Sequence, residues 1–423
     1  MDKPRLVCVS MPTPHSGGGG LRALRSLKEY SKYFETYLFP LFTLRERRYI
    51  DVVKELQSTG VKISGYINPS ALLYGIKLTR KILYLFPRLL RPHIGAVNFK
   101  GVVALHEGLD AIFIGNILGD YFNIPKIALL QLPPFYSSKD RVRNILRAAM
   151  RWRKLIAGNS LHEKISNMES IVRFNTYYGL TSRRLRRLLG KYDVIITVSK
   201  SIPMEMGDEW LDRVVSLDPG VSLDEDDLRT IISLRSSVRR KANYLIFGGR
   251  PVYEKGFIDA LIAFKSISRH HSDLKLIVTG YPRGIPIQRL RRACRKLGVE
   301  DKVLFTGFLA RERRFELVAK ARLMLYPSYM DAFPYAVLES LYLGTPVVGY
   351  SIPALDIYYG KHPSVKLVSE GDIEALTIEA LNMLEKTGEF IEPPKIRSWR
   401  EIMDEEVSLI KKTIEKLSGL REP

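Results

Sequence analysis

Two short segments in the second half of the chain carry charged residues suited to holding a phosphorylated ligand. In Phe247 to Gly256 (FGGRPVYEKG), Arg250 and Lys255 flank a glycine-containing turn, so an arginine fork and a lysine point charge can grip a diphosphate. Further on, Asp331 precedes a predicted helix and Glu339 projects from it. A carboxylate before a helix can hold sugar hydroxyls, and one within the helix can hold a ribose diol. The free amides and the dipole of the helix N-terminus favour phosphate.

A third segment, Pro12 to Leu21 (PTPHSGGGGL), lies between the first strand and the first helix. Its four consecutive glycines let the backbone approach a ligand and turn amides toward it. It is not a Walker loop, because no Gly-Lys-Ser/Thr follows. A degenerate dinucleotide fingerprint fits, but the second strand ends without the acid that would bind a ribose. We therefore favour a general ligand loop over a nicotinamide site or a flexible turn. The residues expected to face the ligand are His15, Gly17, Gly18, Gly19 and Gly20.

Side-chain amides occupy two positions, after predicted strands, at which a titratable side chain could have acted as a base. Gln131 follows the strand Lys126 to Leu130 (KIALL), and Asn116 follows the apolar run Asp110 to Gly115. A glutamine can orient a hydroxyl but cannot accept its proton at neutral pH. Of the histidines, only His15 lies in a credible site. We therefore assign no protein general base.

These segments are positioned by short apolar strands that alternate with helical patterns. This alternation predicts an α/β fold with doubly wound parallel sheets, in which ligands bind beyond the carboxyl ends of the strands. Pro219-Gly220 marks a linker near 217–224, so we expect domains over 1–216 and 217–396 and a terminal helix in 397–423 that returns toward the first domain. The expected strands are Leu6–Ser10, Asp110–Gly115, Lys126–Leu130, Tyr192–Val198, Tyr244–Phe247, Leu274–Thr279, Val303–Thr306, Leu323–Tyr326 and Pro346–Val348.

Composition narrows the class of protein. The 423 residues carry 66 basic and 45 acidic side chains, a formal net charge of +21, which favours polyanionic partners. The two cysteines, Cys8 and Cys294, exclude a disulfide scaffold and a four-cysteine zinc site. No secretory signal and no apolar run of about 18 residues is visible. We therefore expect a cytoplasmic protein, either soluble or peripheral at the cytoplasmic face of the membrane.

The three motifs, in this order, resemble those of the retaining nucleotide-sugar glycosyltransferases of family four (glycosyl transferases group one), which have the GT-B fold. In that family a Glu, seven residues and a second Glu form the donor motif, which here reads Asp331 to Glu339 (DAFPYAVLE). Gly249 to Gly256 is similar to the family's diphosphate clamp, and Gly17 to Gly20 to its glycine loop. The likeness covers most of 244–349, and only landmarks of the first half. It implies two Rossmann-like domains that face each other across a cleft.

The resemblance also implies roles for the site residues. Arg250 and Lys255 would neutralise the departing diphosphate. Asp331 would hold the transferred sugar and Glu339 the ribose. The candidate catalytic residues are Asp331, Arg250 and Lys255, and the candidate donor-binding residues are Gly249, Arg250, Lys255, Asp331, Ala332, Phe333, Pro334 and Glu339. His15, Gly17 to Gly20 and Gln131 would form the acceptor and phosphate loop. No metal and no cofactor is implied besides the nucleotide sugar, which is a substrate.

Two positions depart from the family pattern. Asp331 replaces the first Glu, so its carboxylate reaches about one methylene less, which puts the contact to the sugar in doubt. Gln131 stands where many relatives carry a His. The resemblance then implies a same-face displacement with retention, in which the leaving phosphate helps to take the acceptor proton.

Basic clusters in the first half predict a surface partner. They comprise Lys77, Arg80, Lys81 and Arg88; Arg143, Arg147, Arg151 and Lys154; and Arg183, Arg184, Arg186 and Arg187. Either these are solvated faces, or they adhere to anionic lipid, which would suit a polyprenyl-linked acceptor. Nucleic acid is disfavoured, because the aromatic residues lack the interleaved pattern of a stacking platform.

The function expected from the sequence is transfer of a sugar from a nucleoside diphosphate sugar to a glycan or lipid-linked acceptor. Two alternatives stay open. One is a nucleotide-sugar epimerase of the same fold, which would release a free sugar epimer without an acceptor. The other is a non-catalytic protein that binds nucleotide sugars or polyanions, which the replacement at Asp331 keeps open.

Overall fold

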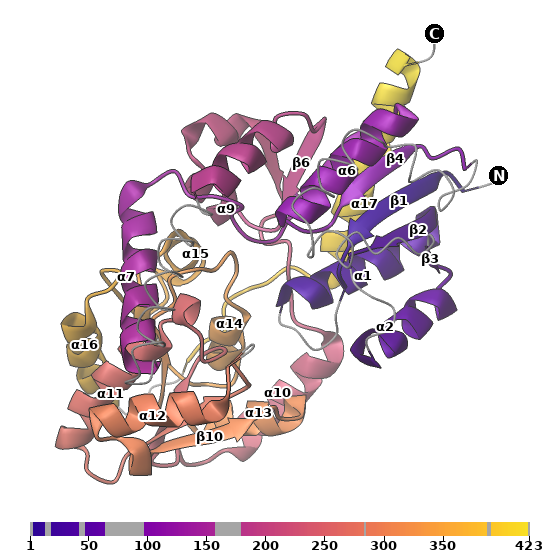
Figure 1. The fold of residues 1–423 in the computed structure, drawn as a ribbon. Coiled ribbons are helices and arrows are strands. Elements are labelled where there is room, and N and C mark those ends of the chain that lie inside the picture. Colours follow the sequence, from indigo (N-terminus) through magenta and orange to yellow (C-terminus); the bar gives the residue numbers. More distant parts are fainter. Residues whose placement is uncertain are drawn as a thin grey trace. The chain divides into compact units, whose positions relative to one another are not determined.

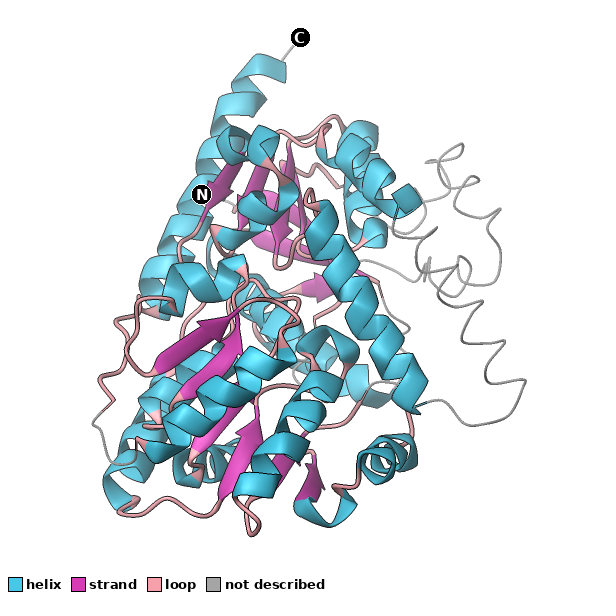
Figure 2. Ribbon diagram, turned by 90° about the vertical axis from the view of Figure 1, so that its left-hand side faces the viewer, coloured by secondary structure: helices cyan, strands magenta, loops and turns pink. Residues whose placement is uncertain are grey.

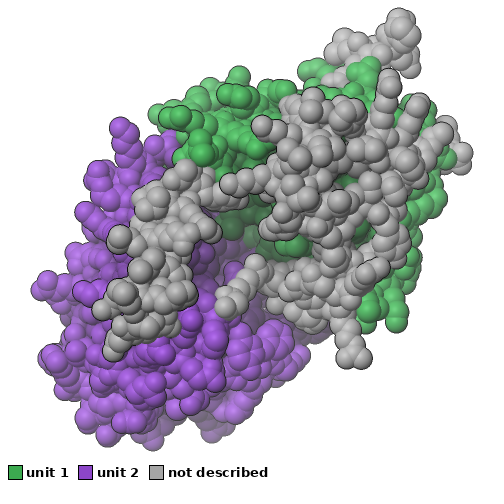
Figure 3. Space-filling view, in the orientation of Figure 1, with its two compact units in different colours: residues 1–135, 178–221, 397–423 green, residues 136–177, 222–396 purple. Residues whose placement is uncertain are grey.

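The computed structural model describes residues 3–12, 18–41, 47–63, 97–156, 179–282, 285–386 and 391–421 (Figure 1). The chain divides into two compact units, coloured separately in Figure 3. Unit 1 comprises Met1–Phe135, Tyr178–Val221 and Arg397–Pro423, and unit 2 comprises Tyr136–Tyr177 and Ser222–Ile396. Each unit is described by itself below.

The described part of unit 1 is built on a parallel sheet with the strand order β3-β2-β1-β4-β5-β6-β7. The order reverses between β1 and β4, which makes this pair of strand ends the switch point where ligands bind in such sheets. The strands are β1 (Arg5–Ser10), β2 (Glu35–Pro40), β3 (Lys62–Ile63), β4 (Gly101–Ala104), β5 (Lys126–Leu130), β6 (Val194–Thr197) and β7 (Val214–Ser216). The helices are α1 (Gly18–Tyr33), α2 (Arg47–Ser58), α6 (Leu109–Phe122), α9 (Ser201–Met206), η2 (Asp208–Arg213) and α17 (Trp399–Arg421).

One expected strand of unit 1 is wrong. Asp110 to Gly115 lies inside α6, and the strand beside β1 is the shorter β4. Residues Ala111 to Gly119 of α6 are all buried, so the segment shows a continuous apolar run like that of a buried strand. Its length of 14 residues is helical. Asn116 consequently bonds within α6 and to Lys126, at 3.3 Å in each case.

A buried polar cluster fastens α17 to α1 in unit 1. Arg22 and Glu406 form an ion pair, and both side chains are at most 1% exposed. Ser26 Oγ donates to Glu406 Oε1 at 2.9 Å, and Tyr30 donates to the same oxygen. Arg22 Nε also donates to the carbonyl of Gly220 at 2.7 Å. The cluster therefore ties together three segments that lie far apart in the sequence.

The described part of unit 2 is also built on a parallel sheet, with the strand order β10-β9-β8-β11-β12-β13. The order reverses between β8 and β11. In Figure 2 the magenta strands of each unit lie among cyan helices. The strands are β8 (Tyr244–Phe247), β9 (Lys275–Thr279), β10 (Val303–Gly307), β11 (Leu323–Tyr326), β12 (Val347–Tyr350) and β13 (Val365–Val368). The helices are α7 (Lys139–Ile156), α10 (Glu225–Ser237), η3 (Tyr253–Lys255), α11 (Phe257–His270), α12 (Ile287–Leu297), η4 (Glu300–Lys302), α13 (Arg311–Lys320), α14 (Tyr335–Tyr342), α15 (Pro353–Tyr359) and α16 (Ile373–Glu385).

Unit 2 differs from the expected domain 217–396 in two segments. Residues 217–221 belong to unit 1 instead. Residues 136–177 belong to unit 2, although they precede the last strands of unit 1 in the sequence. The reason is the amphipathic helix α7, whose apolar face, including Ile145, Ala149 and Trp152, is buried, and which packs against α11, α12 and η3. Strand–helix alternation alone does not reveal which sheet a helix covers.

The described residues bear on the cysteines and on helices that could cross a membrane. Cys8 and Cys294 are free, buried thiols, as expected. Within the described ranges, no helix combines the length and the apolar character needed to cross a membrane.

Candidate active site

The two charged motifs of unit 2 follow neighbouring strands. Leu325 of β11 pairs with Phe247 of β8, and the Gly248 amide donates to the Leu325 carbonyl at 2.9 Å. The chain after β8 then turns through Gly256, which has φ 66°, and a Cβ there would lie 1.8 Å from the carbonyl oxygen of Pro327. Only glycine fits, because any side chain would push the two loops apart. Both loops therefore meet at the switch point of the sheet.

The structure brings Lys255 and Asp331 together. Lys255 Nζ lies 2.5 Å from Asp331 Oδ2 and 2.8 Å from the carbonyl oxygen of Met330. Tyr326, at the end of β11, donates its hydroxyl to the same carboxylate oxygen. Burial, and then the charge of Asp331, raises the pKa of Tyr326 well above its usual value, so this hydroxyl stays protonated. A cation suited to phosphate thus stands against the acid expected to hold the sugar.

Backbone hydrogen bonds join the loops that carry these two groups. The amides of Tyr329 and Met330 donate to the carbonyl of Glu254 at 2.8 and 3.2 Å. Glu254 directly precedes Lys255, and Met330 directly precedes Asp331. Main-chain hydrogen bonds, which do not depend on side-chain identity, therefore hold together the two loops that form the ion pair.

Arg250 lies further along the same edge of the sheet. A Cβ on Gly280, which follows β9, would lie 3.8 Å from Arg250 Cγ. Gly249 has φ 115°, and a Cβ there would lie 3.5 Å from Lys255 Cγ. Arg250 is thus placed beside the end of β9, while Lys255 is placed beside the end of β11.

Glu339 is held by a residue that the sequence patterns did not single out. The Arg314 guanidinium on α13 binds the Glu339 carboxylate on α14 with both Nη atoms, at 2.6 and 2.8 Å. Glu339 is almost fully buried. Burial alone would lower the pKa of Arg314, but the charge of Glu339 outweighs it and the pKa is raised. The basic residues of α13 were the sequence signal for Arg314, but such a run cannot be distinguished from a solvated helix face.

The residues between the two acids form the start of α14. Pro334 occupies the N-cap, and the Ala332 amide donates to Asp331 Oδ1 at 3.1 Å. The Phe333 ring packs on Tyr358, with ring centroids 4.9 Å apart. The neighbouring Tyr359 was also missed: its hydroxyl is buried and has no hydrogen-bond partner among the described residues. Burial, and then the charge of Asp331, raises the pKa of Tyr359.

In unit 1 the structure brings Gly19 and Gln131 together. A Cβ on Gly19 would lie 2.7 Å from Gln131 Oε1. Gln131 is 7% exposed, and its Nε2 donates to the Leu105 carbonyl at 2.9 Å, whereas its Oε1 has no partner among the described residues. Gly18, Gly19 and Gly20 form the first turn of α1. His15 and Gly17 lie outside the described residues.

The basic clusters have different outcomes. Arg143 is exposed on α7 and pairs with Asp140, but Arg151 on the same helix binds Asp259 of α11 and is not part of a solvated face. Arg186 pairs with Glu209 and stacks on Phe135. The residues Lys77, Arg80, Lys81 and Arg88 lie outside the described ranges.

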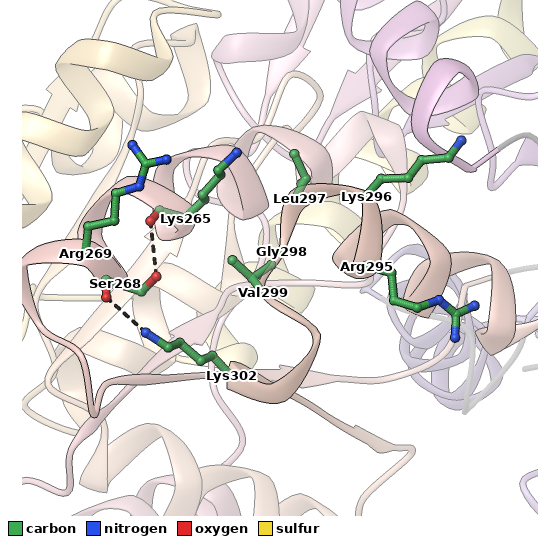
Figure 4. Close-up of a pocket in the computed structure, with 9 residues that line it drawn as sticks. All are labelled: Lys265, Ser268, Arg269, Arg295, Lys296, Leu297, Gly298, Val299 and Lys302. Carbon is green, nitrogen blue, oxygen red and sulfur yellow. Dashed lines mark hydrogen bonds between the residues drawn. The ribbon is translucent and has the colours of Figure 1, made fainter.

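A separate hollow of about 490 Å³ in unit 2 contains none of the expected site residues (Figure 4). Lys265 and Arg269 stand on one side of it, at the end of α11, and Arg295 and Lys296 stand on the other, at the end of α12. Lys302 donates to the Ser268 carbonyl at 3.1 Å. Cations at helix C-termini offset the helix dipole, which accounts for this cluster.

Comparisons with known proteins agree with the motifs. Residues 230–395 match the family model described as glycosyl transferases group 1. An uncharacterized glycosyltransferase of Methanocaldococcus jannaschii is 25% identical over 295 residues, 60% of this chain and 75% of that protein. The alpha-monoglucosyldiacylglycerol synthase of Streptococcus pneumoniae is 27% identical over 144 residues, 32% of both chains.

Solved structures share the fold over almost the whole chain. HepE of Anabaena, in complex with UDP and glucose, has a TM-score of 0.59 and 14% identity, and the match covers 98% of this chain and 100% of that one. Sucrose-phosphate synthase of Thermosynechococcus elongatus has a TM-score of 0.61 and 13% identity, with the same coverage. The expected fold class of two Rossmann-like parallel-sheet units is confirmed. The chain therefore carries a glycosyl transferases group 1 domain at residues 230–395 and is a glycosyltransferase with the GT-B fold.

Proposed function

We propose that this glycosyltransferase moves a sugar from a nucleoside diphosphate sugar to a glycan or lipid-linked acceptor with retention of anomeric configuration. The observation that carries the proposal is the ion pair between Lys255 and Asp331, 2.5 Å apart where β8 and β11 end. In this pair the cation that we propose for the phosphate lies beside the acid that we propose for the sugar. The fold neighbour HepE, solved with UDP and glucose, supports a donor of this class.

The reaction needs positive charge where the diphosphate departs. Lys255 and Arg250 supply it, and because Asp331 and the Met330 carbonyl hold Lys255 before the ligand arrives, this side chain needs little reorganisation as the charge develops. The bond from the anomeric carbon to the phosphate oxygen breaks while the acceptor oxygen bonds to the same face. The acceptor proton passes to the leaving phosphate. Asp331 accepts hydrogen bonds from the sugar hydroxyls with the lone pairs that Lys255 and Tyr326 leave open.

Glu339 is proposed to bind the ribose. Arg314 takes one lone pair of each carboxylate oxygen, at 2.6 and 2.8 Å, and the remaining lone pairs can accept the two ribose hydroxyls. Arg314 also holds this buried acid in a fixed orientation. A lone carboxylate at this depth would otherwise be costly.

Two exposed aromatic side chains are suited to the base. Tyr281 follows β9 and Phe308 follows β10, and they are 60% and 64% exposed. A Cβ on Gly307 would lie 2.5 Å from the Tyr281 hydroxyl, which places this ring over the end of β10. Bases stack on such rings with little dependence on their identity. We propose that the base lies against these side chains.

On the acceptor side, Gln131 Oε1 is proposed to accept a hydrogen bond from an acceptor hydroxyl. The buried oxygen faces Gly19 at the start of α1 and has no partner among the described residues. The similarity to the alpha-monoglucosyldiacylglycerol synthase of Streptococcus pneumoniae favours a lipid-linked acceptor. The side chains of Arg143, Arg147 and Lys154, which are exposed on α7, favour binding to an anionic membrane surface. The proposal uses no metal.

The test is a thermal-shift panel of UDP, GDP and ADP sugars, followed by a transfer assay and nuclear magnetic resonance of the product. A true donor stabilises the fold, by about 2.7 kcal/mol at a hundredfold excess over Kd. We expect one base to be preferred and the anomeric configuration to be retained. Release of a free epimer without an acceptor identifies an epimerase. Binding without turnover of any acceptor identifies a non-catalytic binding protein.

A further inference from the structure

Helix α7 supports the loop that carries Lys255. It packs against η3, the short helix that ends at Lys255, and against α11, which begins two residues later (α7 and α11 in Figure 1). The buried Trp152 ring lies edge-on to Phe257, with centroids 6.2 Å apart. A helix from the first half of the sequence thus backs the clamp turn.

The same helix holds the loop that carries Asp331, through a shared carboxylate. Arg151 Nε and Nη2 donate to the two oxygens of Asp259 at 2.9 and 2.8 Å. Tyr329 and Tyr350 donate their hydroxyls to Asp259 Oδ2, the latter at 2.9 Å. Burial alone would lower the pKa of Arg151, but the charge of Asp259 outweighs it and the pKa is raised. Arg151 also donates to the Tyr329 hydroxyl.

A second arginine of α7 holds the other end of Tyr329. Arg141 Nη2 donates to the Tyr329 carbonyl at 2.8 Å, and Arg141 pairs with Glu370. Asn144 Nδ2 donates to Glu370 Oε2 at 3.0 Å. Tyr329 is therefore gripped at both its side chain and its backbone, two residues before Asp331.

We infer that Arg151 is a positioning residue for the donor sugar, acting through Asp259 and Tyr329 to fix where the Asp331 carboxylate stands. The inference rests on the proposed function of Asp331. Hydrogen bonds from a guanidinium fork are directional, whereas apolar packing alone lets a loop slide. Without Arg151, Asp259 would be a buried acid lacking its cation, and Tyr329 would lose a partner that fixes its ring. The contact of Asp331 with Lys255 would then loosen although neither residue is changed.

The test compares Arg151→Met, which keeps most of the side-chain stem, with Lys139→Met at the exposed start of the same helix. We expect Arg151→Met to lower kcat at least tenfold, while Kd for the free nucleoside diphosphate changes less than threefold. Lys139→Met should stay within twofold of the parent for both. Tyr329→Phe removes only the hydroxyl and should lower kcat less than Arg151→Met. The double variant should fall by less than the product of the two single effects, because both act through Asp259.

Amide hydrogen exchange tests the same inference without a substrate. In Arg151→Met the amides of Tyr329 and Met330, which bond to the Glu254 carbonyl, should exchange at least tenfold faster, while those in β12 should not change. Unchanged exchange, or kcat within twofold of the parent, overturns the inference. If Arg151→Met does not fold, Tyr329→Phe decides by the same two measurements. A parent protein that binds no nucleotide sugar contradicts the proposed function instead, and exchange then decides positioning alone.

Discussion

Each unit has a buried carboxylate that binds an arginine and accepts a hydrogen bond from at least one tyrosine hydroxyl, yet the two clusters are built differently. In unit 1, Arg22 and Glu406 are at most 1% exposed, and they bind α1, α17 and the Gly220 turn. In unit 2, Asp259 is equally buried, but Arg151 is 30% exposed. The Arg22 cluster holds α1 two residues after its glycine turn, whereas the Asp259 cluster ends at a loop that carries a candidate catalytic acid.

The burial of the arginine decides how much such a cluster contributes to stability. Removing one partner of a deeply buried ion pair leaves an uncompensated charge, which costs about 3–5 kcal/mol of stability. A half-exposed arginine is partly hydrated already, so its loss costs less stability. We therefore expect changes in the Arg22 cluster to appear in unfolding experiments, and changes near the Asp331 loop to appear in turnover.

The largest effect is expected for Glu406→Ala. It leaves Arg22 buried without its acid, so the free energy of unfolding of unit 1 should fall by about 3–5 kcal/mol. Glu405→Ala is the control, because Glu405 pairs with Arg397 at the surface, 2.6 Å away, and should cost less than about 1 kcal/mol. Urea unfolding followed by circular dichroism measures both. Equal losses would show that burial does not separate these two acids.

Lys255→Ala should act on turnover rather than on folding. It removes a charge-assisted contact worth about 1.5–3 kcal/mol, so transfer should fall by about ten- to 150-fold. Arg250→Ala should fall in the same range. Lys265→Ala, in the separate hollow of unit 2, should leave transfer unchanged. Near-normal turnover of both clamp variants would remove the diphosphate assignment, whatever the stability measurements show.

Variants of Asp331 distinguish contacts to the sugar from contacts to the nucleotide. Asp331→Asn keeps the size but loses the charge that Lys255 binds, so transfer should fall about tenfold or more, at about 1.4 kcal/mol per tenfold. Binding of the free nucleoside diphosphate, measured by calorimetry, should not weaken. Asp331→Glu restores the family's reach and should retain activity. Full activity of the Asn variant would make Asp331 a loop-ordering residue, and weaker diphosphate binding would place it at the phosphate.

The smallest effect concerns Lys241, which touches neither cluster. Its Nζ donates to the Ala319 and Gly344 carbonyls at 2.6 and 2.7 Å, and burial followed by the charge of Arg235 lowers its pKa to about 8. Above that pH the folded protein binds fewer protons than the unfolded chain, whose lysine titrates near 10.5, so stability rises with pH between about 8 and 10.5. Lys241→Met should abolish this rise in the free energy of unfolding. An identical pH profile in chemical unfolding would contradict it.

The places of the two charged loops in unit 2 could be predicted from the sequence because their signals are local. A short apolar strand, a glycine-containing turn and a charged residue stand within about ten positions of one another, and the parallel sheet then brings the carboxyl ends of its strands together. The pairing of Lys255 with Asp331 follows from this rule, although the residues are 76 positions apart.

What could not be predicted depends on packing between distant segments. Residues Ala111 to Gly119 of α6 are all buried, so the apolar residues within Asp110 to Gly115 show no helical period. Arg151 looks like one more cation on a basic helix, and only the fold shows that Asp259, 108 positions later, lies beneath it. The pairing of Arg314 with Glu339 could not be predicted for the same reason.

The placement of α7 has a consequence for how the chain is made and divided. The helix leaves the ribosome long before the acid that its arginine binds, 108 residues later, so its apolar face must stay uncovered until most of unit 2 has been synthesised. A fragment cut to the family-matched segment 230–395 would include β8 and β11 but lack α7. Such a fragment would expose the Phe257 ring, which Trp152 packs against in the whole chain, and would leave Asp259 without its cation. Unit 2 is thus assembled from two separate segments of the sequence, and no single uninterrupted stretch of this unit contains both α7 and the partners that it packs against.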